Sequence, residues 1–334
     1  MSPELPLSVL DLSSVRSDET ARDAVAHTIA LAQAAERLGY RRFWVAEHHG
    51  MPGVASSAPA VLIAGIAAAT STIRVGSGGV MLPNHASLVV AEQFGTLVAL
   101  YGDRIDLGLG RAPGTDQLTA SLLRRGGVDE TAQDFPNQVI ELFAWFGMSA
   151  PLESGIGSRV VATPGAGAAP EIWLLGSSGF SAQLAGILGV RFAFAHHFAG
   201  GEGTRVALEL YRERFEPSPW LDAPHAAVSV AVAVGATTEQ ARRMTLPQQL
   251  AMIRLRAGSP GRTPTLEEAL AHEWTDAELA FVEQRIASQA VGTREQVLER
   301  LRSLAAETAA DELVVVPQGP DLASRISMLG ALAR

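Results

Sequence analysis

A pair of adjacent histidines, His48 and His49, offers the clearest acid–base chemistry in this sequence. The pair follows Glu47 at the end of an apolar run, Arg42–Ala46, that predicts a β-strand. Histidine changes its charge near neutral pH, so at a strand end it suits a general acid or base. The alternative is an ordinary turn with one hydrogen-bonded histidine. A zinc site is disfavoured, because adjacent strand residues diverge and no helical histidine spacing accompanies them.

Glycines follow the next predicted strand, Ile73–Ser77, in the segment 76–83. Gly78 and Gly79 offer bare backbone there, and a flat ligand can lie against it. The alternative interpretation is a β-bulge or a crowded strand end that has no room for a side chain.

Arg111 lies just past another predicted strand, Ile105–Leu109. A guanidinium at a strand end could bind a phosphate, and it could equally be an ordinary surface charge. The nearby glycines are not spaced as G-x-G-x-x-G, and Pro113 takes the place of the third glycine. We therefore exclude a dinucleotide-binding fingerprint at this strand end.

A serine-rich turn, Gly176–Ser181, follows the predicted strand Ile172–Leu175 and begins a helix. The hydroxyl groups of Ser177, Ser178 and Ser181, with free backbone N–H groups at the helix N-terminus, predict an anion site. Capping of the helix by Ser178 explains part of the pattern without a ligand. The sequence has no G-x-x-x-x-G-K-[ST] motif, so the expected anion is not a nucleoside triphosphate.

Eight short apolar runs alternate with helical patterns and must position these groups. The predicted strands are Leu7–Leu12, Arg42–Ala46, Ile73–Ser77, Ile105–Leu109, Ile172–Leu175, Arg191–Ala195, Val228–Val234 and Leu313–Val316. Strands that alternate with helices predict a parallel sheet, and eight such units favour a closed (β/α)8 TIM barrel over an open sheet. Functional residues of such barrels lie where the strands end, which is where the residues above lie.

Two segments interrupt the alternation. Residues 237–292 form an insertion before the last strand that is much longer than a barrel connection requires, and segments of this kind are often active-site lids. Gly147–Pro170 is rich in glycine, alanine and proline and predicts a second excursion. We find no domain boundary, so the sequence predicts one barrel domain over residues 1–334.

Composition excludes several classes of protein. The 334 residues carry a net charge of −9, which argues against a protein that coats nucleic acid or anionic membranes. The sequence contains no cysteine, so disulfides, thiolate metal sites and cysteine nucleophiles are excluded. No signal peptide is visible, and the longest apolar run is shorter than a membrane span. We therefore expect a cytoplasmic protein without a membrane or nucleic-acid partner.

At four strand ends the sequence resembles the bacterial luciferase-like flavin monooxygenases. The resemblance rests on Glu47–His49, Val75–Pro83, Asp103–Arg111 and Gly176–Ser181, which match in order and spacing. The pattern is most similar to the alkanal-monooxygenase-like branch. This resemblance implies that reduced FMN binds on the C-terminal face of the barrel as a cosubstrate.

The resemblance also implies a role for each candidate residue. The FMN phosphate would be held by residues that follow two of the predicted strands, namely Arg111, Ser177, Ser178, Gly179 and Ser181. Gly78–Gly79 would form a non-proline cis peptide beneath the isoalloxazine ring. His48 would be the catalytic histidine and His49 a secondary one, and no residue would bind a metal.

The implied reaction is that of a two-component monooxygenase. Reduced FMN would react with O2 to give a C4a-hydroperoxyflavin that transfers one oxygen atom to a small organic substrate, and His48 would move a proton. A separate NAD(P)H:flavin reductase would supply the flavin, and the protein would be a homodimer. The alternatives are a deazaflavin-dependent oxidoreductase of the same barrel family and a non-catalytic flavin-binding protein.

Overall fold

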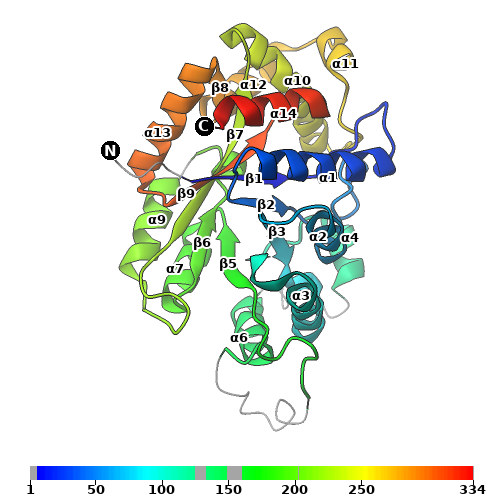
Figure 1. Ribbon diagram of the computed structural model, residues 1–334. Coiled ribbons are helices and arrows are strands. Elements are labelled where there is room, and N and C mark those ends of the chain that lie inside the picture. The colour runs from blue at the N-terminus through cyan, green and yellow to red at the C-terminus, as the bar shows by residue number, and fades with distance from the viewer. Residues whose placement is uncertain (1–5, 125–132, 149–159, 202, 334) are drawn as a thin grey trace.

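Eight parallel strands close into a barrel in the computed structural model, which describes residues 6–124, 133–148, 160–201 and 203–333 (Figure 1). The barrel strands are β1 (Leu7–Asp11), β2 (Arg42–Val45), β3 (Arg74–Met81), β4 (Ile105–Gly110), β5 (Glu171–Gly176), β6 (Arg191–Phe194), β7 (Ala226–Val234) and β9 (Glu312–Pro317). Each pairs in parallel with its neighbours, and β9 closes the barrel between β7 and β1. The predicted (β/α)8 barrel is confirmed.

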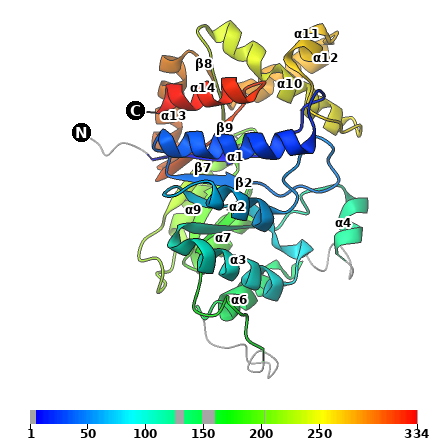
Figure 2. The same cartoon turned by 45° about the vertical axis from the view of Figure 1, so that its right-hand side comes forward.

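Helices cover the outside of this barrel. They are α1 (Ala21–Arg37), α2 (Pro59–Ala68), α3 (Ser87–Tyr101), α6 (Phe135–Trp145), α7 (Gly179–Ile187), α9 (Thr204–Glu213), α13 (Arg294–Thr308) and α14 (Leu322–Leu332). Shorter helical segments are η1 (Leu82–Asn84), η2 (Gly102–Arg104), α4 (Gln117–Leu123) and α8 (His196–Ala199). In Figure 2 the helices α14, α1, α2 and α3 follow one another around one side, where each contacts the next. Part of the expected excursion at 147–170, residues 149–159, lies outside the described residues.

The insertion at 237–292 is mostly helical rather than an extended loop. It comprises α10 (Thr238–Arg256), α11 (Leu266–Ala271) and α12 (Asp276–Ala287), and it ends in a short ninth strand, β8 (Ala290–Gly292), that pairs with β7 alone. Capping boxes at Thr265 and Thr275 explain where α11 and α12 begin. Helix α10 contains the buried Pro247, which has no N–H to donate to the preceding turn.

Charged residues close the N-terminal end of the barrel. The fully buried Arg42, which begins β2, donates from Nη1 to Asp106 (2.6 Å) and Glu171 (2.9 Å). Its Nε donates to Glu312, also buried, at 2.7 Å. Arg74 pairs with Asp106 at 2.6 Å and Arg191 lies 3.4 Å from Glu171, so three arginines face these three carboxylates. This end of the barrel is therefore a structural plug, and the other end is left for function.

A small apolar cluster fills the barrel interior between this plug and the strand ends, and it includes Trp44 and Trp173 in edge-to-face contact. Among the described residues, no helix is both long and apolar enough to cross a membrane.

Candidate active site

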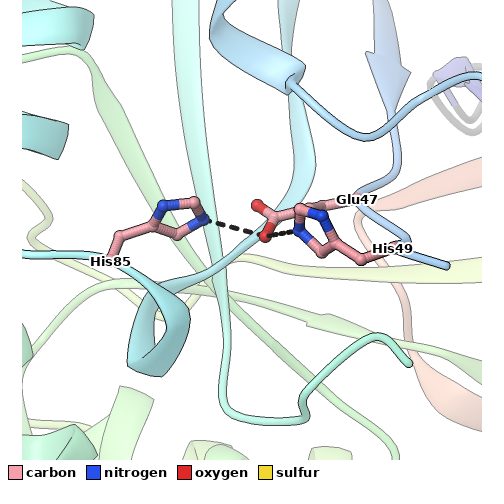
Figure 3. A group of neighbouring side chains, drawn as sticks. All are labelled: Glu47, His49 and His85. Carbon is pink, nitrogen blue, oxygen red and sulfur yellow. Dashed lines mark hydrogen bonds and ion pairs between the residues drawn. The ribbon is translucent and has the colours of Figure 1, made fainter. Parts of the chain in front are cut away.

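The carboxylate of Glu47, just past β2, joins the ends of two strands (Figure 3). Its Oε1 accepts hydrogen bonds from Nε2 of His49 and Nε2 of His85, each at 2.8 Å. Its Oε2 accepts from the backbone N–H of Met81 at 3.1 Å. Burial alone would raise the pKa of Glu47, but the two histidines and the Met81 amide together lower it to about 2. Glu47 is therefore ionised and fixes both histidines.

The ligand atoms of Glu47, His49 and His85 lie within 4.8 Å of one another, and these residue types can bind a metal ion. The sequence analysis did not anticipate this cluster, because His85 comes from the connection after β3. Both Nε2 atoms already donate to the Glu47 carboxylate, which satisfies these polar groups without an ion. We assign the cluster a positioning role.

Replacing Glu47 with glutamine is expected to lower the free energy of unfolding by on the order of 3 kcal/mol at pH 7, from the pKa shift of this buried group. The folded pKa lies below the unfolded value, so this stabilisation is present above about pH 4.5 and is lost as the pH falls toward 2. Urea unfolding of the wild-type protein and Glu47→Gln at pH 7 and pH 3.5 measures this loss. The difference in unfolding free energy between the two proteins should be smaller at pH 3.5. An equal difference at both pH values would contradict the assignment.

His48 has a hydrogen-bond partner outside this cluster. Its ring Nδ1 lies 3.1 Å from the carbonyl of Gly114, and this contact fixes the tautomer with the proton on Nδ1. Nε2 is then an acceptor, and it has no hydrogen-bond partner in the part of the chain that the structure describes. Burial lowers the pKa of His48, so the ring is neutral at pH 7.

A cavity of about 270 Å³ lies against His48 on the C-terminal side of the barrel. Ends of β1 and β9 line one side of it, and residues after Pro247 in α10 line another. His49 does not line the cavity, as expected for a neighbour on extended backbone. The cavity thus gives His48, rather than His49, access to a small molecule.

His197, in α8, also lines this cavity and was missed by the sequence analysis. Its Nδ1 lies 2.7 Å from the Ser229 hydroxyl. Burial, reinforced by the charge of Arg285, lowers the pKa of His197 to about 4. The sequence did carry a signal for His197, because the pair His196–His197 directly follows the predicted strand Arg191–Ala195.

The glycines after Ser77 lie where the backbones of β3 and β4 approach closely. The Gly78–Gly79 peptide bond is cis, as the resemblance implied, and the β3–β4 register shifts at this point. A Cβ on Gly79 would lie 2.7 Å from the carbonyl oxygen of Gly108, and one on Gly108 would lie 2.2 Å from that of Ser77. Side chains are therefore excluded at Gly79 and Gly108.

Arg111, just past β4, packs against the first turn of α7. Its guanidinium lies 4.2 Å from the ring centroid of Phe180, and it forms no ion pair among the described residues. Ser178 is the N-cap of α7, but its side chain makes no capping hydrogen bond. Ser177 and Ser178 are exposed, and Ser181 is buried. A cation, free hydroxyls and the N-terminus of a nine-residue helix that begins at Gly179 together suit a phosphate group.

A model of the luciferase-like monooxygenase family matches residues 5–312. This chain belongs to that family. The family membership confirms the resemblance, whereas placement in the alkanal-monooxygenase-like branch stays a prediction.

Several luciferase-like relatives align along nearly the whole chain. YvbT of Bacillus subtilis (strain 168) is 47% identical over 98% of this chain and 95% of its own length. A luciferase-like monooxygenase of Escherichia coli (strain K12) is 44% identical over 96% and 94%. The N-acetyl-S-alkylcysteine monooxygenase of B. subtilis is 35% identical over 92% and 91%.

Solved structures agree with the luciferase-like fold. Apo-MsnO8 superposes with a TM-score of 0.89 at 36% identity and covers 99% of this chain and 97% of its own. The oxygenating constituent of 3,6-diketocamphane monooxygenase from Pseudomonas putida, in complex with FMN, has a TM-score of 0.72 at 19% identity over 99% and 97%. An F420-dependent secondary alcohol dehydrogenase reaches the same TM-score at 14% identity over 99% and 100%. The last two show the shared fold alone.

Proposed function

We propose that this protein is a flavin-dependent monooxygenase that uses reduced FMN and O2 to oxygenate a small organic substrate. The observation that carries the proposal is the arrangement at consecutive strand ends. The bare Gly78–Gly79 backbone and the Arg111–α7 anion site lie on the same barrel face as His48 and its cavity. One ligand with a flat ring system and a phosphate would use both features.

The residues present fit FMN. The Gly78–Gly79 segment, which has no space for a Cβ on Gly79, would lie under the ring system. Arg111, the hydroxyls of Ser177 and Ser178, and the first N–H groups of α7 would bind the phosphate, with Ser181 supporting the turn. Bound reduced FMN would supply the electrons that activate O2 for transfer to the substrate.

Side chains of the protein would handle proton transfer and shape the cavity. His48 holds its proton on Nδ1 and presents Nε2 to the cavity, so it can accept a proton from a reacting group and return it. Residues of α10 line one side of that cavity. A closed wall there would keep water from the reaction and limit wasteful release of peroxide. We further propose that the 237–292 segment acts as a lid and that a separate NAD(P)H:flavin reductase supplies FMN.

Arg111→Ala is expected to weaken FMN binding by about ten- to a hundredfold, because a charge-assisted hydrogen bond contributes roughly 1.5–3 kcal/mol. Riboflavin has no phosphate and should bind both proteins alike. Fluorescence titration of each flavin with each protein makes the comparison. Equal losses for FMN and riboflavin would place the phosphate elsewhere.

Cofactor and reaction class are tested together by anaerobic titration with reduced FMN and with reduced deazaflavin F420, followed by a pulse of O2. Tighter binding of FMN and substrate-dependent O2 uptake support the proposal. Hydride transfer from F420 without O2 uptake would replace it with a deazaflavin-dependent oxidoreductase. N-acetyl-S-alkylcysteines are the first substrates to try, since a relative 35% identical to this chain is named for them.

A further inference from the structure

One cation in the cavity beside His48 has no ionic partner among the residues that the structure describes. Arg285, in the last turn of α12, lines this cavity and is partly buried. Its Nε donates to Oε1 of the buried Gln249 at 2.8 Å, which fixes the start of the guanidinium. Its two Nη groups have no hydrogen-bond partner within the described ranges. The two Nη groups therefore have N–H donors available to a ligand, on a guanidinium that Gln249 holds in place.

The other arginines that line the cavity lie within ion-pair distance of carboxylates. Arg325 pairs with Asp11, and Arg16 lies 2.8 Å from Asp18. Arg16 also lies 3.2 Å from Glu19, so its single charge is shared between two carboxylates.

The remaining acid on the lining is Asp321. It accepts the Ser324 N–H at 2.7 Å as the N-cap of α14, where a negative charge is stabilised. His48 and His197 are neutral at pH 7, because burial lowers both pKa values. Over the described residues, Arg285 is therefore the one arginine of the lining that has no carboxylate within ion-pair distance.

We propose that this cavity binds a small organic acid whose carboxylate pairs with the Nη groups of Arg285. The inference rests on the proposed function in one respect, namely that this acid is the molecule to be oxygenated. A guanidinium with two free Nη groups matches a carboxylate with two parallel hydrogen bonds. Burial and the nearby charge of Arg256 already lower the pKa of Arg285, so an anion would relieve an unfavourable environment.

The rest of the lining indicates the body of this acid. Apolar side chains from β1, the connections after β1 and β2, α10 and α8 surround the space, including Leu10, Leu12, Met51, Val54, Met252 and Phe198. The cavity has a volume of about 270 Å³. The expected ligand is thus compact and apolar apart from its carboxylate. Pairing at Arg285 would fix which carbon or sulfur atom of the acid faces His48.

The test measures binding to the flavin-free protein by isothermal titration calorimetry. The probes are hexanoate, 4-phenylbutyrate and N-acetylphenylalanine, each compared with its primary amide. The variants are Arg285→Gln, which keeps an amide near Gln249, and Arg285→Lys, which keeps the charge. The matched control is Arg256→Gln: Arg256 stacks on Phe281 as Arg285 does (4.7 Å and 5.7 Å), but it does not line the cavity.

We expect at least one acid to bind the wild-type protein ten times more tightly than its amide. Arg285→Gln should weaken that acid by ten- to a hundredfold and leave its amide unchanged. Arg285→Lys should restore part of the loss, and Arg256→Gln should change binding less than threefold. The inference is overturned if no acid binds better than its amide, or if Arg285→Gln and Arg256→Gln have equal effects.

Failure of this inference and failure of the proposed function are separable. FMN binding and substrate-dependent O2 uptake test the function and do not involve the acid–amide comparison. A protein that fails to bind FMN but discriminates acids through Arg285 would keep the anion site and lose the monooxygenase assignment. Normal FMN binding and substrate-dependent O2 uptake, with acid binding that does not depend on Arg285, would keep the monooxygenase assignment and remove the anion site.

Discussion

His48→Gln is expected to fold and bind FMN nearly as the wild-type protein does, yet to transfer oxygen 10²–10⁴-fold more slowly. Glutamine retains much of the size of histidine and one N–H donor, but it cannot accept and return a proton near pH 7. O2 consumption should continue, with hydrogen peroxide released in place of oxygenated product. The measurement is product formed per reduced FMN consumed, with peroxide counted in parallel.

The control is His49→Gln, which should be milder because His49 binds Glu47 and does not line the cavity. The pH profile gives a second readout. Because burial lowers the pKa of His48 below its ordinary value of 6.5, the acid limb of the wild-type profile should lie below pH 6.5. This limb should vanish in His48→Gln. Full coupling in that variant with loss of coupling in His49→Gln would transfer the role to His49.

Arg42→Met is expected to cost about 3–5 kcal/mol of unfolding free energy, because it removes the cation from a fully buried ion network. Asp106 and Glu312 would then remain as buried carboxylates, each without its main partner. The matched control is Arg41→Met, whose side chain is 42% exposed and lies 3.7 Å from Glu312. Because the Arg41 guanidinium is partly exposed and Glu312 keeps its contact with Arg42, the loss of Arg41 should cost about 1 kcal/mol or less.

The cost of Arg42→Met should depend on pH in a direction that the network dictates. Without the guanidinium, burial raises the pKa of Asp106 further above its unfolded value, so the folded variant binds a proton that the unfolded chain releases. Its stability therefore falls as the pH rises, and the deficit should be smaller at pH 5 than at pH 8. Urea unfolding at the two pH values checks this. A deficit below 1 kcal/mol at pH 8 would mean that the plug does not stabilise the fold.

The barrel could be predicted because its signal is local and repeated. Each strand is a short buried run, and every run is followed by a helical pattern or a turn. The position of His48 followed from the rule that strand ends share one face. The glycine segment was predicted less well: β3 continues through Gly78 and Gly79 to Met81, because its neighbour β4 supplies partners on both sides of the register shift.

Other parts of the site depend on contacts between distant segments and could not be predicted from local patterns. His85 joins Glu47 across two strand ends, and nothing near it in the sequence indicates that approach. Arg285 lies on a helix of the insertion, where an arginine in a last turn is common for reasons unrelated to ligands. Its significance depends on the pairing of every other charge around the cavity, which only the folded structure shows.

Pro247 divides α10 into two parts with different constraints on mutation. The part before it precedes the cavity wall, and the part after it supplies Gln248, Ala251, Met252 and Leu255 to that wall. None of these four side chains belongs to the barrel strands or to the ion network around Arg42. Evolution can therefore vary about two turns of one helix to suit a new molecule, while the barrel that carries the proposed FMN site and His48 stays unchanged.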